Sequence, residues 1–219
     1  MRESIASRLS TNIEARNESA VFPEAQRASN DRPCSHVGLD MSPAKSYHSN
    51  SSMNSLAGHF LIARPVLRDP NFARSVVLIL QHGSAGAFGL VVNRKAKLKD
   101  LPFPVYVGGP CKSDGLLILH GHPDWIDTQD ELEQRQVADG IFVGDGDCLK
   151  RLSEPAEGEV LRYRLFTGNS GWGPGQLEGE LATGAWSVVP ASAEFMFDTP
   201  IAEIWKGLLP PQIPEPSVN

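Results

Sequence analysis

Short apolar runs separated by Gly, Pro, Asn and Asp fill the chain between residues 56 and 209. This pattern is typical of β-strands joined by tight turns. The run from Val76 to Leu80 is apolar throughout, which indicates a strand covered on both faces, whereas segment 160–166 alternates and places Arg162 and Arg164 outward. We predict eight strands, at residues 59–63, 75–81, 88–93, 105–107, 116–120, 140–143, 160–166 and 185–189.

Helical patterns are fewer and lie in the second half of this region, at residues 148–152, 175–182 and 201–208. Each is flanked by residues that favour the start or the end of a helix. These are Asp145 or Asp147 before the first, Pro174 and Gly184 around the second, and Thr199 and Pro200 before the third. Because strands dominate the first half and helices the second, we predict an α+β fold rather than a doubly wound α/β sheet.

The N-terminal part of the chain has a different composition. Its first 55 residues hold twelve of the twenty serines and equal numbers of basic and acidic residues, with no sustained hydrophobic period. We interpret residues 1–54 as a disordered or misannotated N-terminal extension. A short helix within residues 5–20 is the alternative, although such a stripe has nothing evident to pack against.

The C-terminal end is rich in proline. Four prolines between residues 210 and 216 remove backbone donors and block the continuation of a helix, so we expect the fold to end at Leu209 and residues 210–219 to form a tail. The intervening stretch, residues 55–209, has a length typical of one domain. We therefore predict a single compact domain.

The charge balance narrows the classes of partner. The chain has a formal net charge of −6, and because the first 55 residues are neutral, the predicted domain carries all of it. Such a domain repels duplex DNA and anionic membranes, so neither is expected as a direct partner. The basic run from Arg94 to Lys99 is expected to be a solvated hairpin loop. No apolar run approaches the roughly 20 residues that span a bilayer, which predicts a soluble protein.

The cysteines indicate the compartment and one candidate site. Cys34, Cys111 and Cys148 are odd in number and lack CxxC spacing, which is typical of a reducing compartment, and we expect the protein in the cytoplasm. Cys111 follows a Gly-Gly-Pro segment, and the neighbouring Lys112 favours its thiolate, so Cys111 is the candidate reactive thiol, with an inert thiol as the alternative. The glycines lack the spacing of a nucleotide-binding loop and predict a turn at the end of a strand.

Five motifs occur in order along the predicted domain. They are Leu-Ala-Gly-His-Phe-Leu-Ile-Ala-Arg-Pro-Val-Leu-Arg-Asp-Pro-Asn-Phe from Leu56, Gly-Ala-Phe-Gly-Leu-Val-Val-Asn-Arg from Gly86, Val-Tyr-Val-Gly-Gly-Pro from Val105, Gly-Asn-Ser-Gly-Trp-Gly-Pro-Gly-Gln-Leu-Glu-Gly-Glu-Leu from Gly168, and Phe-Asp-Thr-Pro from Phe197. On these motifs, the chain from Ser55 to Leu209 resembles the YqgE/AlgH family of bacterial proteins. The resemblance implies an α+β domain with a strongly bent, barrel-like mixed β-sheet and a few flanking helices.

The resemblance implies no particular activity. The family is largely uncharacterised and has no agreed catalytic residues. One branch is labelled a transcriptional regulator, without a recognised DNA-binding motif behind the label. The resemblance therefore supports the fold more strongly than the function.

The first candidate binding segment is the Asp69-Pro-Asn-Phe turn. Each of its residues has a structural reason, since Asp bonds the backbone ahead, Pro fixes φ and Asn71 tolerates a left-handed backbone. Three nearby arginines, Arg64, Arg68 and Arg74, are candidate partners of an anion or, alternatively, a solvated edge. Asn71, Arg74 and Asn93, the last of which belongs to the motif from Gly86, are candidate binding residues.

The second candidate is the glycine-rich segment from Gly168 to Trp172. It is not a serine-hydrolase nucleophile elbow, because Trp172 stands where that motif requires a glycine two positions after Ser170. We expect a tight loop in which Trp172 either plugs a groove of the domain or, together with Ser170, contacts a partner. The exposure of Trp172 distinguishes the two.

The third candidate is the His120-Gly-His122-Pro-Asp124 segment. Two imidazoles and a carboxylate are metal-ligand types, but the sequence places no third ligand near the histidines, and Pro123 breaks the strand. We expect a hydrogen-bonded or solvent-facing histidine pair and no metal.

These features favour a non-enzymatic binding or regulatory protein. No convincing nucleophile and base pair is evident, and no cofactor is expected. The partner is an unidentified protein or small molecule. The alternative is an enzyme that acts on a small molecule through an unrecognised site.

Overall fold

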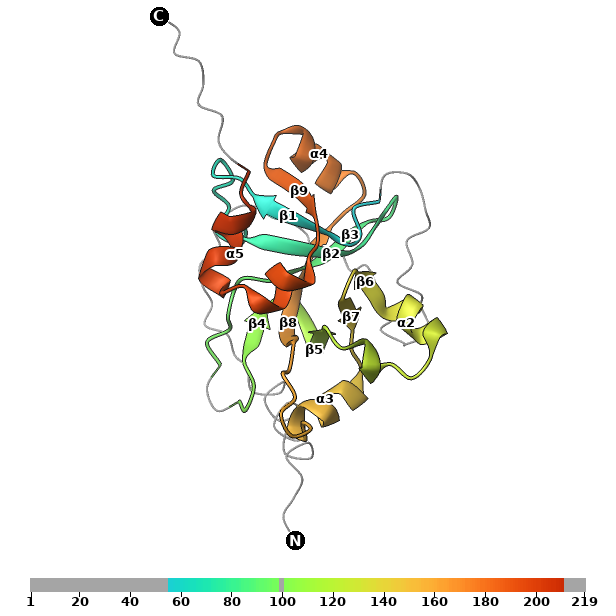
Figure 1. The fold of residues 1–219 in the computed structure, drawn as a ribbon. Coiled ribbons are helices and arrows are strands. Elements are labelled where there is room, and N and C mark those ends of the chain that lie inside the picture. The colour runs from blue at the N-terminus through green and yellow to red at the C-terminus, as the bar shows by residue number, and fades with distance from the viewer. Residues whose placement is uncertain (1–54, 99–100, 211–219) are drawn as a thin grey trace, which may run out of the picture.

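In the computed structural model, which describes residues 55–98 and 101–210, nine strands form a strongly bent sheet (Figure 1). Its order is β6-β7-β5-β8-β3-β2-β1-β9, and β4 pairs with β8 outside this path. All pairings are antiparallel except that of β4 with β8, so the sheet is mixed. The strands are β1 His59–Ala63, β2 Val76–Gly83, β3 Gly86–Val91, β4 Val105–Val107, β5 Cys111–His120, β6 Gln136–Ala138, β7 Ile141–Val143, β8 Tyr163–Trp172 and β9 Trp186–Pro190.

The bend brings the two ends of the sheet toward each other. A Cβ atom on Gly58, just before β1, would lie 2.6 Å from the carbonyl oxygen of Val137 in β6. Strands that are distant in the pairing order therefore touch, which makes the sheet nearly closed and barrel-like. The predicted α+β fold with a bent, mixed sheet in a single domain is confirmed.

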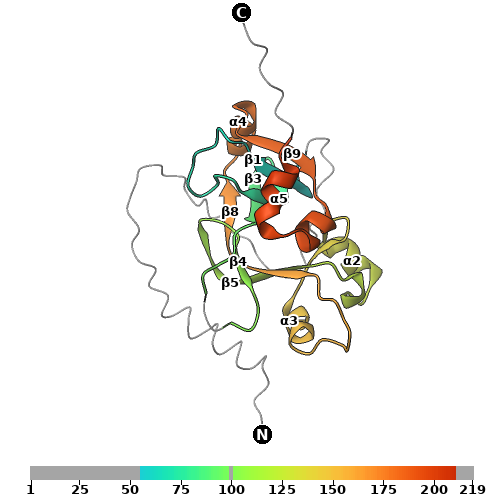
Figure 2. The same ribbon diagram turned by 60° about the vertical axis from the view of Figure 1, so that its left-hand side comes forward.

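Short helices cover the sheet. Helix α4 packs against β3 and β9, α5 against β1, and α2 against β7. Figures 1 and 2 show α4 and α3 at opposite ends of the domain. The helices are the 3-10 turn η1 Pro123–Trp125, α2 Gln129–Arg135, α3 Gly146–Ser153, α4 Gln176–Ala182, the π-turn η2 Glu194–Asp198 and α5 Ile201–Leu208. No helix of these described residues is long and apolar enough to cross a bilayer.

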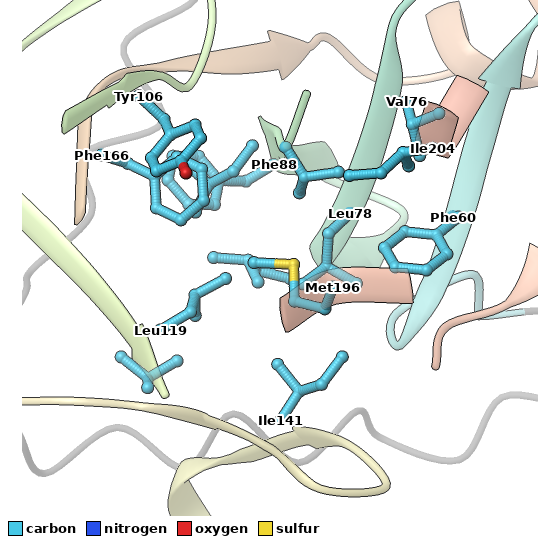
Figure 3. Close-up of a cluster of buried hydrophobic side chains, with 14 of the residues drawn as sticks. Phe60, Val76, Leu78, Phe88, Tyr106, Leu119, Ile141, Phe166, Met196 and Ile204 are labelled. Atoms are coloured by element: carbon cyan, nitrogen blue, oxygen red, sulfur yellow. The ribbon is translucent and has the colours of Figure 1, made fainter. Parts of the chain in front are cut away.

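The continuous apolar run in β2 is buried on both faces, as its pattern predicts. Val76 and Leu78 belong to one buried cluster, whereas Val77 and Ile79 belong to another on the opposite face. Figure 3 shows the first cluster, in which Met196 of η2 lies among the side chains of the sheet. Alternate side chains of one strand thus supply two cores, because successive residues point to opposite faces.

All eight predicted strands are present, but one boundary and one side-chain direction differ in a way that changes the interpretation. The segment predicted as a glycine-rich loop is the second half of β8, where Ser170 pairs with Gly89 and Trp172 with Ala87. The loop prediction is wrong because β3 supplies a partner strand that glycine content does not reveal. Arg164 is also wrongly placed outward, since it is buried.

The predicted helices are present, with adjusted caps. Asp145 caps α3, with its carboxylate accepting from the backbone N–H groups of residues 147 and 148. Helix α5 is preceded by Pro200 rather than Thr199 as its N-cap. Helix α2 was not predicted because none of its residues is buried, so it lacks an apolar stripe. The expectations for residues 1–54 and 211–219 concern parts of the chain outside the described residues.

Candidate functional site: an arginine corner beside β2 and β3

Arg74 has an unusual backbone. The turn between β1 and β2 forms as predicted, with the Asp69 carboxylate accepting from the N–H of Asn71 at 2.8 Å and Phe72 buried as its anchor. The left-handed position is not Asn71, however. Arg74 has φ 58°, the one non-glycine residue in the described part of the chain with positive φ. Such a backbone costs about 1 to 3 kcal/mol and persists only where its surroundings hold it.

Two residues at the end of β3 hold this turn. The Asn93 side-chain amide donates to the carbonyl of Arg74 at 2.9 Å, and its oxygen accepts from the N–H of Val76 at 2.9 Å. The Arg94 guanidinium donates to the carbonyls of Asn71 at 2.6 Å and Ala73 at 3.0 Å. Three predicted binding residues, Asn71, Arg74 and Asn93, are thus brought together. Arg94 is not simply solvated, as the hairpin-loop prediction required.

A buried arginine, Arg164, is hydrogen-bonded to the backbone of the residue before Asn93. The Arg164 guanidinium donates to the carbonyl of Val92 and packs 5.0 Å from the ring centre of Tyr106. Arg164 is 4% exposed, and burial is the main cause that lowers its pKa. A buried cation without a carboxylate partner is costly, so this position favours a nearby negative charge.

Arg74 is the exposed arginine of the group. Its guanidinium carbon lies 6.0 Å from the ring centre of Trp205, whose indole N–H donates to the carbonyl of Ala63 at 2.7 Å. Among the described residues, none of the guanidinium groups of Arg74, Arg94 and Arg164 has a carboxylate within ion-pair distance. Burial lowers the pKa of Arg94, and the nearby charge of Asp69 opposes that effect.

We call this group the arginine corner. It consists of Asn71, Arg74, Asn93, Arg94, Arg164 and Trp205. The corner presents cationic and amide donors, which are the groups that bind carboxylates and phosphates. Arg94, Arg164 and Trp205 were not identified from the sequence as members of the corner. For Arg164, the alternating pattern of residues 160–166 indicated an outward side chain.

Comparisons with known proteins place the chain in a family. The family model described as AlgH-like matches residues 60–215. The chain belongs to the AlgH-like family. Its curated relatives include UPF0301 proteins of Vibrio parahaemolyticus, 34% identical over 172 residues that cover 69% of this chain and 88% of the relative, and of Yersinia enterocolitica, 36% identical over 171 residues with coverage of 69% and 88%. The predicted resemblance is confirmed.

Two solved structures resemble the AlgH-like domain described above. The solution structure of the AlgH protein from Pseudomonas aeruginosa has a TM-score of 0.55 and 31% identity, with coverage of 73% of this chain and 90% of that chain. A crystal structure from Corynebacterium diphtheriae has a TM-score of 0.57 and 24% identity, with coverage of 71% and 86%, and supports the fold alone.

Trp172 and Ser170 lie inside the AlgH-like domain. Trp172 is 1% exposed and packs against Phe72 and Trp186, with ring centres 5.8 and 6.2 Å away, and its N–H donates to Glu180 at 3.2 Å. The Ser170 hydroxyl is buried and donates to the carbonyl of Gly108 at 3.0 Å. Of the two interpretations of Trp172, the buried plug is therefore correct and the exposed aromatic is wrong, because Trp172 fills the second apolar cluster.

The thiols of the AlgH-like domain differ in exposure. Cys111 begins β5 and is half-buried, with Asn169 of β8 as its pairing partner, and its reactivity stays a prediction. Cys148 is buried, and burial is the main cause that raises the pKa of its thiol. Within the described residues, no group of three His, Cys, Asp or Glu side chains is arranged to hold a metal ion. The rings of His120 and His122 instead pack against Trp125.

Proposed function

We propose that this protein is a non-enzymatic binding or regulatory protein whose arginine corner receives a carboxylate or phosphate group of its ligand. The observation that carries the proposal is Arg74, an exposed cation on a left-handed backbone that Asn93 holds in place. Strained backbone that the surroundings maintain is concentrated at ligand sites. A connecting turn alone would be satisfied by glycine at this position.

The electrostatics of the corner support an anionic ligand. The chain has a net charge of −6, so the protein as a whole repels anions and their binding requires a local group of cationic side chains. The Arg74 guanidinium makes no hydrogen bond to the described residues, which leaves its donors available in a fork that suits carboxylates and phosphates. The corner contains no pair of nucleophile and general base, so binding is favoured over catalysis.

Loss of Arg74 should weaken anion binding. We expect the full-length protein to bind inorganic phosphate or citrate, with NMR shifts centred on residues 71–75 and 93–94. The Arg74→Ala variant should bind about 10- to 100-fold more weakly, because a charge-assisted hydrogen bond contributes roughly 1.5 to 3 kcal/mol. Arg151→Ala removes the same charge at an exposed position of α3 and serves as the control. Equal losses in the two variants, or no shifts at the corner, would refute the proposed site.

A second substitution separates strain from binding. Arg74→Gly should relieve the left-handed backbone, so we expect the free energy of unfolding to stay unchanged or to rise by up to about 1 kcal/mol while anion binding is lost. Arg74→Ala should show no such gain, because alanine keeps the strain. Urea unfolding of both variants measures the difference. A loss above about 1 kcal/mol in Arg74→Gly would instead assign the side chain a structural role against Trp205.

A further inference from the structure

The rings of His120, His122 and Trp125 form a stack where β5 ends. The His122 ring lies 4.3 Å from the Trp125 ring at an angle of 8°, and the His120 ring lies 5.2 Å from Trp125 and 5.8 Å from Phe142 of β7. His120 is the last residue of β5, whereas His122 and Trp125 belong to segment 121–128, which connects β5 to α2 (Figure 1). The stack fixes this connection against the end of the sheet.

Two hydrogen bonds that hold the segment require neutral histidines. The backbone N–H of His122 donates to Nδ1 of His120 at 3.3 Å. The backbone N–H of Arg162, the residue before β8, donates to Nε2 of His122 at 2.8 Å. A backbone N–H can only donate, so each of these ring nitrogens must be an unprotonated acceptor. The neutral rings therefore carry their protons on Nε2 of His120 and Nδ1 of His122. A second proton on either ring would face a donor and break that bond.

The surroundings of His120 add to this sensitivity. His120 is fully buried, and its Nε2 has no hydrogen-bond partner in the described part of the chain. A Cβ on Gly144 would lie 3.1 Å from both the His120 ring and the Cys148 sulfur, so the backbone packs closely on this edge. Burial is the largest cause that lowers the pKa of His120 to about 4, and burial also lowers the pKa of His122.

Charged groups around His120 oppose one another. Arg135 disfavours its protonation and Asp145 favours it, but these two form an ion pair at 2.5 Å, which limits the effect of either. The neighbouring Cys148 thiol and the Tyr163 phenol both have raised pKa values through burial and stay neutral.

The charges around His122 also oppose one another. Asp124, 4.0 Å from His122 Nδ1, and Glu159 favour protonation, whereas Arg162 disfavours it. Glu159 is engaged by the indole N–H of Trp125 at 3.2 Å. Arg162 pairs with Asp198 at 2.6 Å. Burial and hydrogen-bond direction therefore decide the protonation of both histidines.

We propose that His120, His122 and Trp125 form an acid-labile latch that holds segment 121–128 against β8 at neutral pH and releases it when the histidines are protonated. Release uncovers Trp125, which packs in a third cluster of buried side chains together with Val105, Ile118, Cys148, Leu152 and Leu165. The device is independent of the arginine corner and regulates access to this end of the domain. It requires only protons, which break both acceptor bonds and place charge next to apolar rings.

Hydrogen exchange of the full-length protein tests the latch. After correction for the intrinsic exchange rate, we expect protection of segment 121–128 to fall as the pH drops from 6.5 toward 4, while β2 and β3 stay protected. Each histidine that is protonated only in the released state raises the opening constant by up to about tenfold per pH unit in this window. A segment as protected at pH 4.5 as at pH 7, or a loss of protection throughout the domain at the same pH, would overturn the proposal.

Matched variants isolate the histidines. In His120→Asn and His122→Gln, the side-chain oxygen takes the place of the accepting ring nitrogen but does not titrate, so the double variant should stay latched across this range. His59→Gln is the control, because the His59 ring donates to the carbonyl of Ala57 and its protonation breaks no bond. If the double variant does not fold, His122→Gln alone should reduce the pH slope to that of one proton. An unchanged slope in these variants would refute the latch.

Discussion

Replacement of Trp172 by alanine should lower the free energy of unfolding by roughly 3 to 5 kcal/mol, the range expected when a buried tryptophan is truncated. The ring fills the second apolar cluster between Phe72 and Trp186, and its N–H shares the Glu180 carboxylate with the N–H of Trp186. Truncation therefore leaves a cavity and removes one of two partly buried hydrogen bonds to Glu180. Urea unfolding, followed by circular dichroism so that the lost fluorophore does not matter, measures the effect.

Two variants control this experiment. Trp172→Phe retains most of the ring volume and should lose much less stability. Val160→Ala alters a side chain that is 79% exposed and should stay within about 0.5 kcal/mol of the unsubstituted protein. A Trp172→Ala variant that also stays within 1 kcal/mol would contradict the structural role of Trp172 and restore a surface-contact role.

Gly109→Ala should be at least as damaging, with an expected loss of about 3 kcal/mol or more, or no folded protein. A Cβ at residue 109 would lie 2.2 Å from both the carbonyl oxygen of Asn169 and the hydroxyl of Ser170. Neither obstacle can move cheaply, because one is backbone and the other is a buried, hydrogen-bonded side chain. The backbone around residue 109, which leads into β5, would have to move away from β8.

Gly171→Ala is the matched control. Gly171 lies in the same part of β8, yet a Cβ there would have no neighbour within 4 Å, so the variant should differ from the unsubstituted protein by less than about 1 kcal/mol. Thermal unfolding of both variants gives the comparison. Equal melting temperatures would mean that the crossing at residue 109 is not as close as the structure has it.

The crossing also explains the Val-Gly-Gly-Pro motif. A Cβ on the preceding residue, Gly108, would lie 2.4 Å from the carbonyl oxygen of Gly168. Both glycines are needed where two backbones pass each other, which agrees with a structural reading of the motif rather than a phosphate loop. The sequence predicted the end of a strand here, but the reason lies in β8, about 60 positions along the chain.

Local pattern determined most of the elements. Continuous apolar residues in β2 predict burial on both faces, and β4 and α5 have the predicted bounds, because hydrophobic runs and helical spacing act over a few residues. The pattern failed at α2, which is stabilised by its Thr128 cap and buries no residue. It failed again in the second half of β8, where strand formation depends on β3.

The candidate site was likewise predicted from the sequence only in part. The sequence by itself determined the family, the turn at Asp69 and the presence of Asn71, Arg74 and Asn93 in its motifs. Only the tertiary structure decided that these residues meet, that Trp172 is inside and that Arg164 turns inward. Backbone hydrogen bonds between β2 and β3 fix which distant side chains become neighbours, and the bend of the sheet fixes which face is covered, so neither can be read from the spacing of residues along one strand.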